Sequence, residues 1–313
     1  MDKTKFNLWV MGVVVGGLVL AGLGWIINLS YNAYSQYKIT PQTKFNKLKA
    51  LQDVNFQTNL GPRTVGSPAH EQTRQWIVKN LEAAGWETSV QETQYPQPIA
   101  NIIGRWGKTG PIIIIGAHYD SRFIADKDPD PARRTFPVPG ANDGASGVAV
   151  LLEMARVIPQ VAHQMQQERQ IYLVFFDTED NGNIPGWDWI LGSQAFVQKL
   201  QALNVRPEAA VIIDMIGDAD LNIYQESNSD PGLTQEIWNQ AARSGYSKYF
   251  LPMQKYNILD DHIPFLNAGI PAVDIIDFDY PYWHTTEDTA DKVSGDSLKA
   301  VGDTLINWIL QKP

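Results

Sequence analysis

The spacing of apolar residues divides most of the chain into helices and strands. Six stretches place apolar side chains three and four residues apart, as on one face of a helix; they cover residues 43–57, 69–84, 146–159, 192–203, 232–244 and 296–311. Residues 90–95 and 99–106 have the pattern of a strand pair. Four shorter runs are mostly apolar and rich in β-branched residues; they cover 112–115, 171–176, 210–213 and 272–276.

Short apolar runs of this kind are typical of strands that are covered on both faces. Because they alternate with helices, we expect a three-layer α/β fold in which helices flank a mostly parallel central sheet. Asp274 is the one charge that interrupts the four runs. From residue 41 onward there is no Ser/Gly-rich linker, charge block or repeat, so residues 41–313 are expected to form a single domain.

The N-terminal region has a different pattern. Residues 8–27 are free of charge over about the length that a helix needs to cross roughly 30 Å of hydrocarbon. Trp9 and Trp25 lie near its ends, and Lys3 and Lys5 precede it. These features predict a membrane anchor and juxtamembrane segment over 1–40, with a helix at about 8–28 and a cytoplasmic N-terminus. The domain at 41–313 would then be extracytoplasmic (periplasmic or extracellular). A cleaved signal peptide is the alternative; it would have a shorter apolar region that ends in small residues.

Composition limits the chemistry that the chain can perform. Its 34 acidic and 25 basic residues give a net charge of −9, which argues against a nucleic-acid partner. The chain has five histidines and no cysteine, so it has no thiolate nucleophile and no cysteine-ligated metal. A transition-metal site would therefore have to use His, Asp and Glu.

Each of the four apolar runs leads to acidic residues or histidines. The first is followed by HYD at 118–120, the second by DTED at 177–180, the third by Asp214, and the fourth by a stretch that ends at His284. In open α/β sheets, sites form at the carboxyl ends of the strands, so these side chains should share one cleft. Burying so much negative charge without a cation would be costly, and a divalent metal is the simplest compensation.

Some of these residues also have ordinary structural interpretations. His118 and Asp120 would point the same way on a strand, so Asp120 could hold the second imidazole nitrogen of a metal-binding His118. Equally, they could be a loop histidine beside a turn aspartate. Asp143 lies in the Gly-rich segment GANDGASG at 140–147, before a helix. Taken alone, it is expected to cap that helix or form an Asx turn rather than bind metal.

Three further acids are open to two interpretations. Of the adjacent Glu179 and Asp180, one can bind a metal while the other acts as a general acid/base, since burial and neighbouring acids would raise its pKa. The alternative is an ordinary acidic loop. Asp260 comes shortly before the segment IPFL at 263–266 and could cap a short helix.

The order of these motifs resembles that of the zinc aminopeptidases with a bacterial leucyl aminopeptidase fold and of their relatives, the glutaminyl cyclases. The resemblance covers most of residues 50–311 and includes RTVGSP at 63–68. Several segments are specifically similar to glutaminyl cyclases; they are HYDS at 118–121, FFD at 175–177, DDHIPFL at 260–266 and WHT at 283–285. ED at 179–180 and LGSQ at 191–194 are similar to bacterial cyclases of the animal type.

The resemblance to cyclases implies one zinc ion held by Asp143, Asp180 and His284. It also implies a cis peptide bond after Asp143. Asp180 stands where animal cyclases have glutamate, and because its side chain is one methylene shorter, ligand reach or metal position must adjust.

The same resemblance implies roles for four other side chains. Glu179 would be the general acid/base, and Asp214 and Asp260 would form a hydrogen-bonded acid network around the transferring proton. Trp283 would form a wall of the substrate pocket. The implied reaction converts the N-terminal glutamine of peptides or proteins to pyroglutamate and releases ammonia.

A two-zinc aminopeptidase, which hydrolyses N-terminal residues from peptides, is the alternative activity. His118 and Asp214 would then bind the second zinc, and Asp143 would bridge both ions. The sequence retains every ligand position for both activities. In either case the substrates are peptide or protein N-termini, and the N-terminal helix would attach the enzyme to a membrane. A membrane-anchored binding domain with a degenerate site is a third interpretation, but no position of the series carries a non-coordinating residue.

Overall fold

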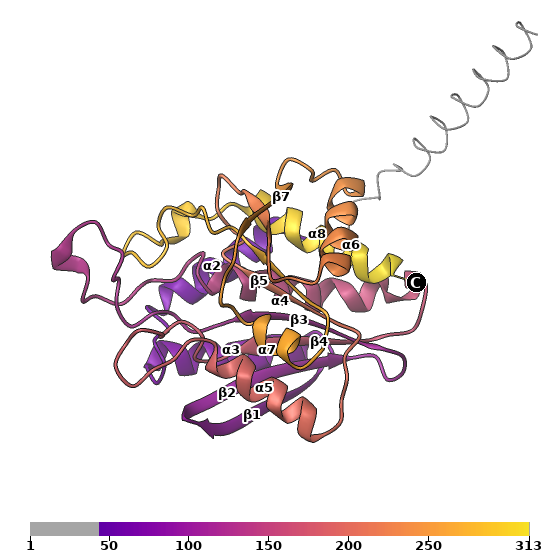
Figure 1. Ribbon diagram of the computed structural model, residues 1–313, viewed down its shortest axis with the longest axis horizontal. Helices are drawn as coiled ribbons and strands as arrows, with labels where there is room; N and C mark the ends of the chain where they lie inside the picture. Colours follow the sequence, from indigo (N-terminus) through magenta and orange to yellow (C-terminus); the bar gives the residue numbers. More distant parts are fainter. Residues whose placement is uncertain (1–43, 313) are drawn as a thin grey trace, which may run out of the picture. The chain divides into compact units, whose positions relative to one another are not determined.

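Six strands form the central sheet of the computed structural model, which describes residues 44–312 (Figure 1). They are β1 (Glu87–Tyr95), β2 (Gln97–Trp106), β3 (Ile112–His118), β4 (Gln170–Phe176), β5 (Ala209–Asp214) and β8 (Ala272–Ile276), in the order β1-β2-β4-β3-β5-β8. Strands β4, β3, β5 and β8 are parallel, whereas β1 and β2 extend the sheet antiparallel at one edge. The four apolar runs thus form the parallel part of a mixed sheet, and the predicted strand pair forms its antiparallel part.

Both faces of this sheet are covered by helices, as the apolar runs predict. Ile113 and Ile115 belong to a core shared with α4 (Ala145–Val161) and α8 (Gly295–Gln311). Ile114, which points to the opposite face, belongs to a core shared with α5 (Leu191–Ala202) and α7 (Ile263–Asn267). The remaining helices add residues to the first core; they are α2 (Lys47–Asn59), α3 (Pro68–Ala83) and α6 (Pro231–Arg243).

The six predicted helices are all present, and local capping explains where several of them begin. Ser67 accepts a hydrogen bond from the backbone N–H of His70, and Pro68 occupies the first turn of α3. Asp230 caps α6 in the same way, again with a proline in the first turn. Three short 3-10 helices lie in the connections; they are η1 (Pro131–Arg133), η2 (Ala162–Gln164) and η3 (Ala290–Lys292).

A small second sheet has no counterpart among the predicted elements. It pairs β6 (Ile223–Glu226) with β7 (Phe250–Tyr256) in parallel. β6 has only four residues, and β7 contains Pro252 and is largely exposed, so neither segment has the apolar pattern of a covered strand. The sheet matters for the site because the chain runs directly from β7 into residues 257–260, which line the cavity described below.

Among the described residues, one helix is long and apolar enough to cross a membrane. This stretch, Ala145–Gln164, includes α4, and most of it is buried inside the protein. It is therefore the core helix that covers one face of the sheet. The predicted anchor helix at about 8–28 lies outside the described residues.

Candidate active site and metal centre

The carboxyl ends of the parallel strands meet at one cavity of about 230 Å³. His118 ends β3, Glu179 and Asp180 follow β4, Asp214 ends β5, and His284 lies beyond β8. The residues that line the cavity include Asp143, Glu179, Asp180, Asp214, Asp260, Trp283 and His284. The sequence-based expectation of one shared cleft is therefore confirmed for these residues. His118 does not line the cavity but lies 3.1 Å from two residues that do, Asp143 and Asp214.

Three side chains from distant parts of the sequence form what we call the first triad: Asp143, Asp180 and His284. His284 Nε2 lies 2.9 Å from Asp180 Oδ1 and 3.8 Å from Asp143 Oδ2. All three residues are buried, and neither Asp143 Oδ2 nor Asp180 Oδ2 has a hydrogen-bond partner. Two buried oxygens without donors beside an imidazole are a donor set that fits a zinc ion.

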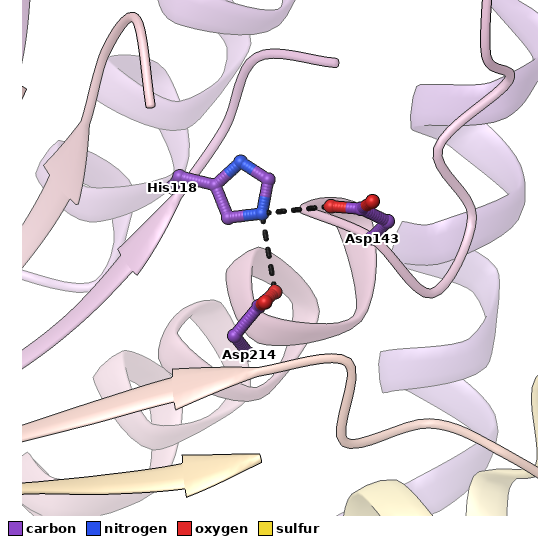
Figure 2. Close-up of side chains that lie close together, drawn as sticks. All are labelled: His118, Asp143 and Asp214. Carbon is purple, nitrogen blue, oxygen red and sulfur yellow. Dashed lines mark hydrogen bonds and ion pairs between the residues drawn. The ribbon is translucent and has the colours of Figure 1, made fainter. Parts of the chain in front are cut away.

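A second triad lies beside the first and shares one member with it. His118 Nε2 lies 3.1 Å from Asp143 Oδ1 and 3.1 Å from Asp214 Oδ1. Figure 2 shows both carboxylates directed at the same ring nitrogen. Because each triad uses a different oxygen of Asp143, this carboxylate lies between two possible metal positions.

Asp120 connects His118 to the first triad. Its Oδ1 lies 3.5 Å from His118 Nδ1, the arrangement expected of a carboxylate that orients an imidazole. Its two oxygens also accept hydrogen bonds from the backbone N–H groups of Glu179, at 3.1 Å, and Asp180, at 3.3 Å. Asp120 is fully buried, so it fixes both the ring of His118 and the backbone of the Glu179–Asp180 pair.

The Gly-rich segment holds Asp143 through its backbone and leaves the side chain free to face the histidines. Asp288 accepts hydrogen bonds from the N–H groups of Asn142 and Asp143, at 2.8 and 3.1 Å. Gly144, with φ of 90°, precedes α4, which has no side-chain cap. Asp143 thus does not cap the helix, contrary to the interpretation of that residue taken alone. The implied cis bond is also wrong, since the described residues contain none and the positive φ of Gly144 supplies the turn.

Crowding of acids changes the protonation of the cluster. Burial, together with the charge of Asp143, raises the pKa of Asp180 to about 6 and that of Asp214 to about 7. Burial and the neighbouring acids raise the pKa of Glu179 well above its usual value. Burial opposes a charge on His284, but Asp180 and Asp126 raise its pKa to about 9. Without a cation, the site therefore retains protons at neutral pH.

Asp260 belongs to a deeper layer of acids. It lines the cavity, and its Oδ2 is buried without a hydrogen-bond partner. Burial, and then the charges of Asp260 and Asp214, raise the pKa of the fully buried Asp274 well above its usual value. His262 is also fully buried, 3.2 Å from Glu226 Oε2. Asp274, the charge that interrupts the fourth apolar run, is thus part of this layer.

Aromatic rings form the walls of the cavity. Trp283 lines it, as expected, and its ring centroid lies 3.9 Å from that of His284 and 4.8 Å from that of Phe278. Trp189 lines it as well, with its ring stacked at 6.0 Å on His284. Sequence reasoning missed Trp189, and only its position just before the LGSQ segment at 191–194 could have indicated it.

Sequence reasoning also missed two charged residues behind the first triad. Asp126 Oδ1 lies 3.4 Å from His284 Nδ1, and the buried Arg122 pairs with Asp126. Arg122 lies four residues after His118, but nothing in the sequence relates it or Asp126 to His284.

Comparisons with known proteins agree with this geometry. The family model described as peptidase family M28 matches residues 101–309. The chain is 26% identical to the glutaminyl-peptide cyclotransferase of Boiga irregularis over 90% of this chain and 84% of that protein. Two solved structures are similar over most of their length. One, of a leucine aminopeptidase precursor from Bacteroides thetaiotaomicron, has a TM-score of 0.80 and 31% identity, over 87% of this chain and 99% of that one. The other, of Porphyromonas gingivalis glutaminyl cyclase, has a TM-score of 0.78 and 33% identity, over 85% of this chain and 98% of that one.

Proposed function

The chain belongs to peptidase family M28, and from this premise we propose that it is a zinc-dependent glutaminyl-peptide cyclotransferase. It converts the N-terminal glutamine of peptides or proteins to pyroglutamate and releases ammonia. The observation that carries the proposal is a complete acid and histidine cluster around a tryptophan-walled cavity, in a chain that covers 98% of a solved glutaminyl cyclase.

We propose that Asp143, Asp180 and His284 hold the zinc ion. When bound, zinc supplies a Lewis acid that polarises the carbonyl of the substrate's γ-amide. The buried oxygens of Asp143 and Asp180 that lack donors support this assignment.

Trp283 and Trp189, which both line the cavity, would form apolar walls for the substrate's terminal residue. The cavity of about 230 Å³ is smaller than the roughly 300–1,000 Å³ of sites for drug-sized ligands, which suits one terminal residue. Holding the glutamine side chain folded brings its own α-amine to the carbonyl carbon (Cδ) of the side-chain amide. Because nucleophile and electrophile belong to one molecule, much of the entropic cost of their encounter is already met.

Glu179 would move the proton. As the α-amine nitrogen bonds to the carbonyl carbon (Cδ) of the side-chain amide, Glu179 accepts a proton from that nitrogen and donates one to the amide nitrogen, whose bond to Cδ breaks so that it leaves as ammonia. Its raised pKa, caused by burial and neighbouring acids, suits a carboxyl that both accepts and donates near neutral pH. Asp214 and Asp260 would form the acid network that surrounds this proton.

A two-zinc aminopeptidase is the second candidate, and the second triad is the observation that favours it. His118, Asp143 and Asp214 are close enough together to hold an ion of their own. The similarity to a leucine aminopeptidase precursor points the same way. Cyclisation requires no activated water, so the favoured reaction requires only one zinc ion.

Product analysis of the full chain separates the two candidates. We expect pyroglutamyl peptide and ammonia from a peptide that begins with glutamine, and no free amino acid from peptides that begin with leucine or glutamine. Release of the first amino acid without pyroglutamate would show that the chain is an aminopeptidase and not a cyclase. The Glu179→Gln variant is the matched blank, because it removes the proposed proton carrier and keeps the side chain's size.

We also propose that residues 1–40 attach the enzyme to a membrane, with the N-terminus in the cytoplasm and the catalytic domain on the outer side. The charge-free segment at 8–27 and the lysines before it support this topology. A protease that is added outside intact cells, or to their periplasm, should digest the catalytic domain of the membrane-bound protein. Full protection of that domain until the cells are lysed would contradict the topology.

A further inference from the structure

Arg122 is buried beside the proposed zinc site, where an unpaired guanidinium charge would be costly. Only 1% of the residue is exposed. Its Nε and Nη2 donate to the two carboxylate oxygens of Asp126, at 2.8 and 3.1 Å. Its other hydrogen bonds go to backbone carbonyls, from Nη1 to Asp180 at 3.1 Å and from Nη2 to Gly182 at 3.1 Å. A bidentate pair of this kind fixes the plane and position of the carboxylate.

Asp126, whose carboxylate is fixed in this way, also contacts the ring of His284. The Oδ1 atom that accepts from Arg122 Nε also lies 3.4 Å from His284 Nδ1. In the neutral imidazole, a proton on Nδ1 would face this carboxylate and leave Nε2 unprotonated toward Asp143 and Asp180.

The residue next to Asp126 also forms a hydrogen bond with the backbone of His284. The N–H of Lys127, next to Asp126, donates to the carbonyl of His284 at 3.2 Å. His284 has φ of 55°, a left-handed conformation that is uncommon for a histidine. Contacts at both ring and backbone therefore hold a conformation that the histidine would not adopt unaided.

Arg122 also contacts a second proposed metal ligand, Asp180, and one wall of the cavity, Trp189. Its Nη1 lies 3.6 Å from Asp180 Oδ1, in addition to its bond to the Asp180 carbonyl. Its guanidinium carbon lies 4.9 Å from the centre of the Trp189 ring, which in turn stacks on His284. One buried side chain thus contacts Asp126, Asp180 and Trp189.

We propose that Arg122 and Asp126 form a positioning pair that sets the geometry of the metal ligands and of the substrate wall together. Asp126 orients the ring of His284, while Arg122 orients Asp126 and fixes the backbone of Asp180 and the ring of Trp189. The proposal rests on the zinc site of the proposed function and is independent of whether the reaction is cyclisation or hydrolysis.

Metal binding by the full chain tests the pair without relying on turnover. We would measure the dissociation constant of Zn²⁺ by competition with a chelator, and the visible absorption spectrum of the Co²⁺-loaded protein. Asp126→Asn is the main variant, since it keeps the size of a side chain that is 34% exposed and removes its charge. We expect about 10- to 100-fold weaker Zn²⁺ binding and an altered Co²⁺ spectrum. Arg122→Lys, which keeps the charge but loses the two-pronged bond, should weaken binding in the same direction.

Two matched controls come from the same loop. Arg133 and Asp130 also pair with each other, at 3.7 Å, but their side chains are 47% and 53% exposed and neither residue lines the cavity. Arg133→Lys and Asp130→Asn should leave both readouts unchanged. The double variant Arg122→Lys/Asp126→Asn should lose less Zn²⁺ affinity than the sum of the two single losses, because both changes break the Arg122–Asp126 contact.

Wild-type Zn²⁺ affinity, within about twofold, and a wild-type Co²⁺ spectrum in Asp126→Asn would overturn the proposal. So would fully additive losses in the double variant. Thermal unfolding of each metal-free variant separates misfolding from a local effect, and Asp126→Asn carries the test if Arg122→Lys does not fold. Product analysis of the wild type decides the reaction separately, so the positioning pair and the cyclase assignment can fail independently.

Discussion

The two triads share Asp143 but differ in what supports their histidines. Behind His284, Asp126 is paired with the buried cation Arg122. Behind His118, Asp120 accepts hydrogen bonds from backbone N–H groups and from the Asn181 amide. The first triad therefore has a built-in positive charge next to its acids, and the second is supported by neutral donors.

The carboxylates on the far side of the triads differ as well. Asp180 faces Arg122, whereas Asp214 faces the buried acids Asp260 and Asp274. An acid in such a group keeps a proton more readily than it keeps a negative charge. Neighbouring sites that are built from the same residue types can therefore suit different chemical roles. The first triad suits a metal ion, and Asp214 of the second suits the handling of a proton.

Replacing either histidine with alanine should have the largest effects and tests the difference between the two triads. His284→Ala should abolish zinc binding and reduce cyclisation to the uncatalysed level, because the metal loses its nitrogen ligand. His118→Ala should retain one zinc ion and lose far less activity. Metal analysis and steady-state kinetics of the two variants give the answer, and each variant controls for the other. Equal loss of activity, with two ions in the wild type, would favour the peptidase.

Removing the proton carrier should have the next largest effect. Glu179→Gln is expected to lower kcat by about 10²- to 10⁴-fold, the usual contribution of general acid/base catalysis, while zinc affinity stays near the wild-type value. Kinetics combined with chelator competition measure both quantities. Glu168→Gln, at an exposed glutamate remote from the cavity, is the control. Activity within tenfold of wild type would remove Glu179 from its role.

Changing the wall of the cavity should affect binding more than chemistry. Trp283→Ala removes an aromatic face worth about 1.5–3 kcal/mol of apolar burial, so KM should rise by about 10- to 100-fold. Trp283→Phe should recover most of the loss. A fall in kcat with an unchanged KM would show that the ring acts on His284, which it contacts, and not on the substrate.

The smallest expected effect is on stability. Folding raises the pKa of Asp180 to about 6, of Asp214 to about 7 and of His284 to about 9, from ordinary values of 3.8, 3.8 and 6.5. At these three positions the folded metal-free chain thus binds more protons than the unfolded chain, so their contribution to stability is complete below about pH 4 and is lost as pH rises to about 9.

Zinc replaces those protons, and its stabilising effect should therefore grow with pH. Melting temperatures between pH 5 and 8.5, with a chelator and with zinc, measure the two curves. We expect them to diverge as pH rises. Curves that stay parallel would mean that the cluster does not exchange protons for metal.

Much of the fold and of the cleft was predictable because each signal was local. Four apolar runs indicate covered parallel strands, and their carboxyl ends necessarily meet at one edge of the sheet. The β6–β7 sheet was not predictable, because Pro252 and exposed side chains hide a strand that only tertiary contacts stabilise. Asp143 shows the limit of local reasoning, since its segment indicates a cap and the fold turns its side chain toward two histidines.

The parts of the site that sequence reasoning missed depend on contacts between distant segments. Asp126 is recognisable only once β8 and the chain beyond it bring His284 alongside. Trp189 is recognisable only once its loop folds back against Arg122. Both residues support or surround the ligands, and such supporting residues carry no spacing of their own in the sequence.

The central claim is that one zinc ion, held by the first triad, supports cyclisation of N-terminal glutamine. Titration of the metal-free full chain with Zn²⁺, followed by the rate of pyroglutamate formation from a glutamine-initiated peptide, tests it most directly. We expect the rate to rise linearly and to reach its maximum at one equivalent of zinc. A maximum reached only at two equivalents, or no pyroglutamate at any ratio, would contradict it.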